Sequence, residues 1–306
     1  MRYPRLILRN LRRNAYFLMF LNGFLLSSLI YFKTQSSYED GLFASIKASV
    51  NESLDSNDNA DSIVVKAMNT CYHLMSPRLN TFAGMSSAEL GLQAGIFRSA
   101  AVDLMTTDGA CGSYSMVLAR VLETYHYPVR IGQMENNGKY GVHMIVEVNT
   151  GTTWKVLDPT YNLYFTRPDG RLASFQDVEQ DWNYYAHQVP PGYDPHYRYE
   201  GVRYTNWSKI PVIMPGIKKL STLVFGAEET NSFSMRTHFL NTFKIWFNIL
   251  LILEIGLALY TFKQMTRNSK WQPFRYFNLD LSTEPNPLNS ASAHEPGKQD
   301  PARQRT

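Results

Sequence analysis

The sequence predicts an α+β domain held between two membrane-spanning helices. Apolar residues recur at helical spacing in the first part of the domain, up to about residue 124, and strand-like runs follow at residues 141–148 and 154–160. Because helices precede strands and do not alternate with them, we expect an antiparallel sheet with helices packed against it. Long apolar runs before and after this region supply the two spans.

The first apolar run, Ala15 to Phe32, is 18 residues long and just reaches across a bilayer. Five arginines and no acidic residue precede it within residues 1–14, which we expect to form a basic cytoplasmic N-terminus. A cleaved signal peptide is the alternative, but the bulky Tyr31-Phe32-Lys33 that ends the run makes a poor cleavage site. The sequence therefore favours an uncleaved transmembrane helix over residues 15–33.

The second apolar run covers residues 242–262 and is followed by Lys263, Arg267 and Lys270. An amphipathic helix of a soluble protein is the alternative, but the unbroken apolar stretch from Ile249 to Leu253 favours a span. With basic residues beyond both spans, the positive-inside tendency predicts a membrane protein with both termini in the cytoplasm and residues 34–241 outside it. The polar tail, residues 263–306, should be cytoplasmic and largely disordered.

Between the spans we expect a polar stalk over residues 34–60 and one domain over residues 61–241. Asp61 or Ser62 can cap a first helix that ends near Met75, since Pro77 follows it.

A capping signature at Ser86 predicts a second helix that reaches Met105. Ile210 to Phe225 is apolar but interrupted by Pro and Gly, so it predicts a pair of edge strands or a membrane-surface segment.

Three residues of this domain are candidates for thiol chemistry. Cys111 begins a predicted helix, where the helix dipole and free N–H groups favour the thiolate. Two neighbouring strands can bring His143 and Asp158 together, so that an imidazole reaches the sulfur and a carboxylate fixes its tautomer. Each residue alone is more often structural: a buried Cys, a satisfied core His and a turn-forming Asp.

The motifs around these residues resemble the transglutaminase-like (papain-related) superfamily. They are Gly109-Ala110-Cys111 with its helix, Tyr127-Pro128-Val129-Arg130, Gly141-Val142-His143 and Leu157-Asp158-Pro159-Thr160-Tyr161-Asn162. The resemblance covers about 55 residues well and implies a Cys helix packed on an antiparallel sheet. It implies Cys111 as nucleophile, His143 as base and acid, and Asp158 as the orienting carboxylate.

Two features depart from that superfamily. Many members carry a Trp soon after the His, where this chain has Met144 and Ile145. The side chain that gives the second oxyanion donor has no obvious counterpart, and Gln93 is the candidate. The backbone N–H of Cys111 can supply the first donor.

Two functions from different classes follow. The first is a membrane-anchored thiol enzyme that hydrolyses or transfers the acyl group of an amide in a peptide or protein. The alternative is a catalytically inactive binding or assembly module in a membrane complex, for instance one for surface polymer export.

No cofactor and no metal are predicted, because His187 and His196 lack metal-ligand spacing. Nucleic acid is not an expected partner, since the net charge is only +4 and no recognition motif is present. The tyrosines between Trp182 and Trp207 either fill the core of an irregular region or line a substrate groove. Cys71 is expected to be a buried helix residue, although a disulfide with Cys111 is the alternative.

Overall fold

The computed structural model describes residues 15–82, 85, 89, 91–107, 110–151 and 153–267. The chain divides into two compact units, one of residues 20–258 and one of the chain ends, residues 1–19 with 259–306. Only the ends of two helices are described in the second unit. The predicted basic N-terminus and most of the predicted tail lie outside the described residues.

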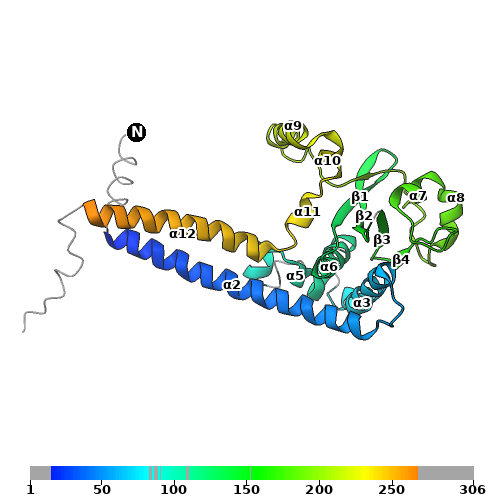
Figure 1. The fold of residues 1–306 in the computed structure, drawn as a ribbon, viewed down its shortest axis with the longest axis horizontal. Helices are drawn as coiled ribbons and strands as arrows, with labels where there is room; N and C mark the ends of the chain where they lie inside the picture. Colours follow the sequence, from blue (N-terminus) through cyan, green and yellow to red (C-terminus); the bar gives the residue numbers. More distant parts are fainter. Residues whose placement is uncertain are drawn as a thin grey trace, which may run out of the picture. The chain divides into compact units, whose positions relative to one another are not determined.

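An antiparallel sheet of five strands in the order β4-β3-β2-β1-β5 forms the centre of the larger unit (Figure 1). Its strands are β1 (Val129–Asn136), β2 (Lys139–Asn149), β3 (Trp154–Asp158), β4 (Leu163–Tyr164) and β5 (Val202–Arg203). β1 and β2 form a hairpin across Asn137 and Gly138, both with positive φ, as a two-residue turn of this kind requires. The predicted α+β class is confirmed.

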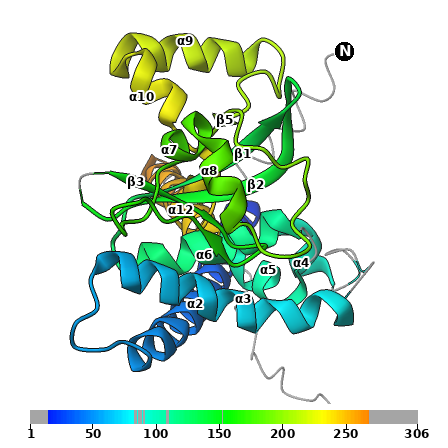
Figure 2. The same cartoon turned by 90° about the vertical axis from the view of Figure 1, so that its right-hand side faces the viewer.

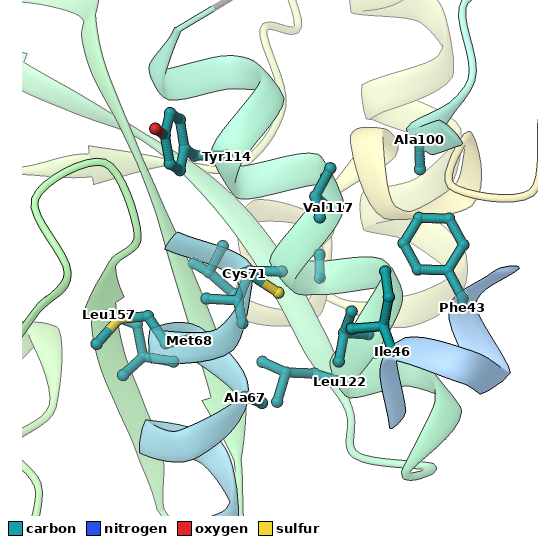
Figure 3. Packing of buried hydrophobic residues seen from close by; sticks show 14 of the residues in the cluster. Phe43, Ile46, Ala67, Met68, Cys71, Ala100, Tyr114, Val117, Leu122 and Leu157 are labelled. Carbon is teal, nitrogen blue, oxygen red and sulfur yellow. The ribbon is translucent and has the colours of Figure 1, made fainter. Parts of the chain in front are cut away.

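Helices cover one face of the sheet. The principal one is α6 (Cys111–Thr124), which packs on β1 and β2 and is flanked by α3 (Ala60–Thr81) (Figure 2). Apolar side chains of several elements meet around it in one buried cluster (Figure 3). Those labelled in the close-up include Phe43, Ile46, Ala67, Met68, Cys71, Val117, Leu122 and Leu157.

The opposite face of the sheet is covered by the chain after β4. This part of the chain contains α7 (Phe175–Gln180), α8 (Trp182–Tyr185) and the short helix η2 (Ala186–Gln188), and it leads to the edge strand β5. A second buried cluster joins this region to the sheet, and it contains Met134, Ile145, Val156, Phe165, Tyr185, Tyr193 and Tyr199. Large rings therefore fill the core of an irregular region, as one interpretation of the tyrosines predicted.

The first helix, α2 (Ala15–Glu52), is longer than the predicted span. It continues into the segment that was predicted to be a polar stalk, so no stalk separates the span from the domain. Phe43 and Val50 in its second half are fully buried against the domain. Asp40 pairs with Arg120 of α6, and Glu39 accepts a hydrogen bond from the backbone N–H of Ala101 at 3.1 Å. The polar composition of this segment reflects one solvent-facing side of an amphipathic helix, and the domain begins well before residue 61.

Two predicted helix boundaries also differ. Asn59, rather than Asp61 or Ser62, caps α3 by accepting from the N–H of Ser62. The helix continues past Pro77 to Thr81, because a proline in a helix costs one backbone hydrogen bond without always ending it.

The predicted second helix is two shorter ones. They are α4 (Leu92–Ile96) and α5 (Ala100–Thr106), and residues 86–88 and 90 lie outside the described part. The two helices are separate because Ser99 starts a new one: its side chain caps α5 by accepting from the N–H of Val102.

Residues 210–225 were predicted to form edge strands or a membrane-surface segment, and they contain a helix, α9 (Ile213–Phe225), so the edge strands were wrong and the membrane-surface segment stays a prediction. Pro215 lies in its first turn, where a missing N–H leaves no intrahelical bond unmade. The short helices α10 (Ala227–Ser232) and α11 (Met235–His238) lead from it to α12 (Thr242–Arg267).

α2 and α12 are long and apolar enough to cross a membrane. The most apolar 18-residue stretch of each helix has a mean hydropathy of 1.4 in α2 and 1.9 in α12. Only 17% and 6% of those stretches are buried, whereas a core helix of a soluble protein would be mostly buried. At the domain end the two helices meet through aromatic rings, with Phe32 of α2 against Phe243 and Trp246 of α12 at centroid separations of 6.3 Å.

Candidate active site

Cys111 is the first residue of α6, as the sequence predicted. Its predecessor Ala110 has φ 41° and ψ −112°, a strained conformation for a residue with a Cβ. The first N–H groups of a helix have no intrahelical partner, and the sulfur of Cys111 lies at this helix start. Asp108 and Gly109 lie outside the described residues.

His143 and Asp158 lie on the neighbouring strands β2 and β3. Val146 pairs with Leu157, so the antiparallel register brings Asp158, at the end of β3, diagonally toward His143. Nε2 of the ring lies 2.7 Å from Oδ2 of the carboxylate, and both side chains are fully buried. The backbone N–H of Thr160 donates to the other carboxylate oxygen at 3.2 Å, which fixes the orientation of Asp158.

The thiol of Cys111 lies within the range in which the ring of His143 acts on its pKa through hydrogen bonding and charge. Since Asp158 engages Nε2, the nitrogen that faces the sulfur is Nδ1. The structure thus joins sulfur, imidazole and carboxylate into one chain of contacts.

Electrostatics in this chain favour an ion pair of thiolate and imidazolium. Burial acts to raise the pKa of Cys111, but the hydrogen bond and charge of His143, with the N–H of Met144, bring that pKa below its ordinary value. Burial likewise acts to lower the pKa of His143, and the charge and hydrogen bond of Asp158 outweigh it, raising that pKa to about 9. Both shifts stabilise the charged partners at neutral pH.

Aromatic rings enclose the imidazole. Tyr197 stacks on His143 with centroids 4.3 Å apart and planes 14° apart, and Tyr161 lies at 5.8 Å. Tyr193 packs against Tyr161 at 4.7 Å. These tyrosine rings restrict water at the face of the imidazole and hold the imidazole in its orientation. Sequence reasoning missed Tyr197 as a neighbour of His143, although the run of tyrosines that contains it was visible.

A cavity of about 700 Å³ opens next to residues that adjoin Cys111 and His143 in the chain. Its walls include Gly112 and Met144, the chain neighbours of Cys111 and His143, and these two walls touch, since a Cβ on Gly112 would lie 3.5 Å from the Met144 sulfur. Arg236 of α11 also lines the cavity, and its Nη1 lies 3.1 Å from the same sulfur.

Cys71 differs from Cys111 in every respect that governs reactivity. Both are free thiols, so the alternative of a disulfide between them does not hold in the structure. Cys71 is fully buried among apolar side chains, and burial raises its pKa to about 12.

Gln93 falls on α4, but its side chain lies outside the described part of the chain. Among the described residues no three or more His, Cys, Asp or Glu side chains gather in a group that could hold a metal ion.

No family model, curated protein or solved structure matches this chain.

Proposed function

We propose that this chain is a membrane-anchored thiol enzyme that hydrolyses or transfers the acyl group of an amide in a peptide or protein. The observation that carries the proposal is the unbroken contact from the Cys111 sulfur through His143 to Asp158, with a 2.7 Å final link. A thiol on a helix start, a charged imidazole and a buried carboxylate are what acyl transfer through a thioester requires. The resemblance to transglutaminase-like domains supports the same chemistry.

In the proposed reaction the Cys111 thiolate attacks the carbonyl carbon of the amide, and the carbonyl π electrons move to oxygen. The backbone N–H of Cys111 stabilises this oxyanion. The C–N bond then breaks, the amine leaves with a proton from His143, and an acyl thioester remains on the sulfur.

Water or a second amine then attacks the thioester. His143, now neutral, takes the proton of the attacking group, and the C–S bond breaks to return the thiolate. Asp158 keeps the ring in the tautomer that presents Nδ1 to the sulfur throughout. Water gives hydrolysis and an amine gives transfer.

We further propose that α2 and α12 anchor the domain with both chain ends in the cytoplasm and the site on the opposite side. Basic residues before α2 and around Arg267 support this orientation. Two spans agree with it, because an even number of crossings returns the chain to the starting side.

Alkylation of the native full-length protein by iodoacetamide tests the proposal. We expect Cys111 to react faster than glutathione at pH 6.5, while Cys71 stays unmodified and reports that the fold is intact. His143→Ala should remove the advantage of Cys111, because burial then raises the pKa of the thiol without an opposing charge.

His196→Ala is the matched control, since His196 is exposed and pairs only with nearby Asp194 among the described residues. It should leave the rate at Cys111 unchanged. Slow labelling of Cys111 in the wild type, unaffected by His143→Ala, would instead favour the inactive binding or assembly module.

A further inference from the structure

The cavity of about 700 Å³ adjoins the proposed site through Gly112 and Met144, the chain neighbours of Cys111 and His143. Its remaining walls are largely flexible apolar side chains, among them Met116, Met214, Met235 and Phe239. Methionine walls adapt to irregular apolar ligands.

The charged groups of this cavity are mainly cationic. Arg98, Lys209 and Arg236 line it, and the only acidic side chain among its described walls is Asp103. That carboxylate is already engaged, because Arg98 donates to it at 2.7 Å and Ser113 donates to it at 2.7 Å. Asp103 therefore compensates Arg98 and leaves the cavity with positive charge in excess.

Arg236 is a cation of this cavity whose charge interacts with Cys111. Its guanidinium contacts the sulfur of Met144, a weak acceptor, and no ion pair joins it to an acidic side chain in the described part of the chain. Burial lowers the pKa of its guanidinium, and the charge of Cys111 opposes that effect. A guanidinium has five N–H donors in a planar fork that suits carboxylate and phosphate oxygens.

We propose that this cavity binds the acyl donor beside its scissile amide, and that the donor carries an anionic group, a carboxylate or a phosphate, which pairs with Arg236. The methionine walls hold an apolar part of the same substrate. This inference rests on the proposed function, since it names the substrate class of that site.

Two small electrophiles of similar size test it, neutral iodoacetamide and anionic iodoacetate. Each forms an S–C bond with the Cys111 thiolate and releases iodide. The preference for iodoacetate over iodoacetamide, normalised to the same ratio for glutathione, should be at least about fivefold in the wild type. In Arg236→Gln the rate with iodoacetate should fall more than the rate with iodoacetamide, so that the preference drops to that of glutathione. Arg236→Lys should keep part of the preference, because it keeps the charge.

Arg171→Gln is the matched control, since Arg171 pairs with Asp169 on the surface, away from the cavity walls. It should keep the full preference. Repeating the wild-type measurement in phosphatidylcholine vesicles with and without phosphatidylglycerol separates two sources of the anion. A preference that vanishes with phosphatidylglycerol assigns a lipid headgroup to the cavity, and one that persists assigns a soluble anionic donor.

An absent preference in a fast-reacting Cys111 would overturn the anionic substrate and leave the thiol enzyme standing. The anionic substrate would also be overturned if Arg236→Gln lowered the rates with iodoacetate and iodoacetamide equally and shifted the pH profile. Arg236 would then serve only to stabilise the thiolate. Failure of the proposed function has a different signature, namely slow reaction of Cys111 with iodoacetamide itself.

Discussion

Asp158→Asn isolates the electrostatic part of the site. The exchange keeps the size of the side chain and the oxygen that accepts from Thr160, but it removes the negative charge 2.7 Å from His143. The rise in the pKa of His143 from 6.5 to about 9 corresponds to about 3 kcal/mol in favour of the imidazolium. Burial alone acts in the opposite direction, so without the carboxylate the ring should be neutral at pH 7.

A neutral ring no longer stabilises the thiolate. About 3 kcal/mol is close to a hundredfold in an equilibrium constant, and the amide of Asn keeps one hydrogen bond, so we expect a loss of about tenfold to a hundredfold in the rate of Cys111 alkylation at pH 6.5. The assay follows iodoacetamide incorporation at Cys111 by mass spectrometry across pH, with Cys71 as internal reference. Asp169→Asn, at an exposed ion pair with Arg171, should change nothing. A profile for Asp158→Asn that superimposes on the wild type would refute the reasoning.

Three further predictions concern stability, each measured as the midpoint of thermal unfolding by circular dichroism. Phe43→Ala should cost about 3–5 kcal/mol, because Phe43 is fully buried between α2 and the domain, whereas exposed Tyr38→Ala should cost less than about 0.5 kcal/mol, and equal effects would contradict a packed second half of α2. Ala110→Gly should stabilise by about 1 kcal/mol by relieving the positive φ, while Ala119→Gly inside α6 should destabilise; a loss at both positions would argue against strain at Ala110. Because the pKa of His143 is raised in the folded chain, its contribution is full below pH 6.5 and is lost as the pH rises through about 9, whereas the lowered pKa of Cys111 acts in the opposite sense. The comparison is therefore made in Cys111→Ala, which should lose more stability between pH 7 and pH 10 than the same variant carrying His143→Ala, and parallel losses would count against the raised pKa of His143.

The parts of the site that sequence predicted are those governed by local pattern. The helix after Cys111 has apolar residues at helical spacing, and the strands around His143 and Asp158 are bounded by turn residues. A short turn between two strands leaves few possible registers. Once His143 and Asp158 were placed on neighbouring strands, the distance between them was therefore nearly fixed. The meeting of sulfur and imidazole then follows from the packing of α6 on β1 and β2.

The parts that sequence missed depend on contacts between distant segments. Nothing local to residues 34–52 distinguishes a stalk from a helix whose apolar side meets α6, because the burial of Phe43 is set by residues some 70 positions later. The same holds for Tyr197 above His143 and for Arg236 beside Met144. In α9, the Pro and Gly that suggested edge strands lie in the first turn of a helix, where they cost little.

The continuous α2 also bears on where the proposed substrate is met. In the proposed topology the helix leaves the membrane near Lys33, and Asp40, seven residues later, pairs with Arg120 of the Cys helix. At about 1.5 Å per residue this contact lies only about 10 Å beyond the membrane boundary, and no flexible stalk lets the domain move away. A second tie comes from α12, whose Phe243 lies against Phe32 and Phe97. Cys111 lies nine residues before Arg120 on α6, which is about 14 Å of helix, so in the proposed topology its thiol stays near the membrane and we expect the acyl donor to present its amide close to the membrane surface.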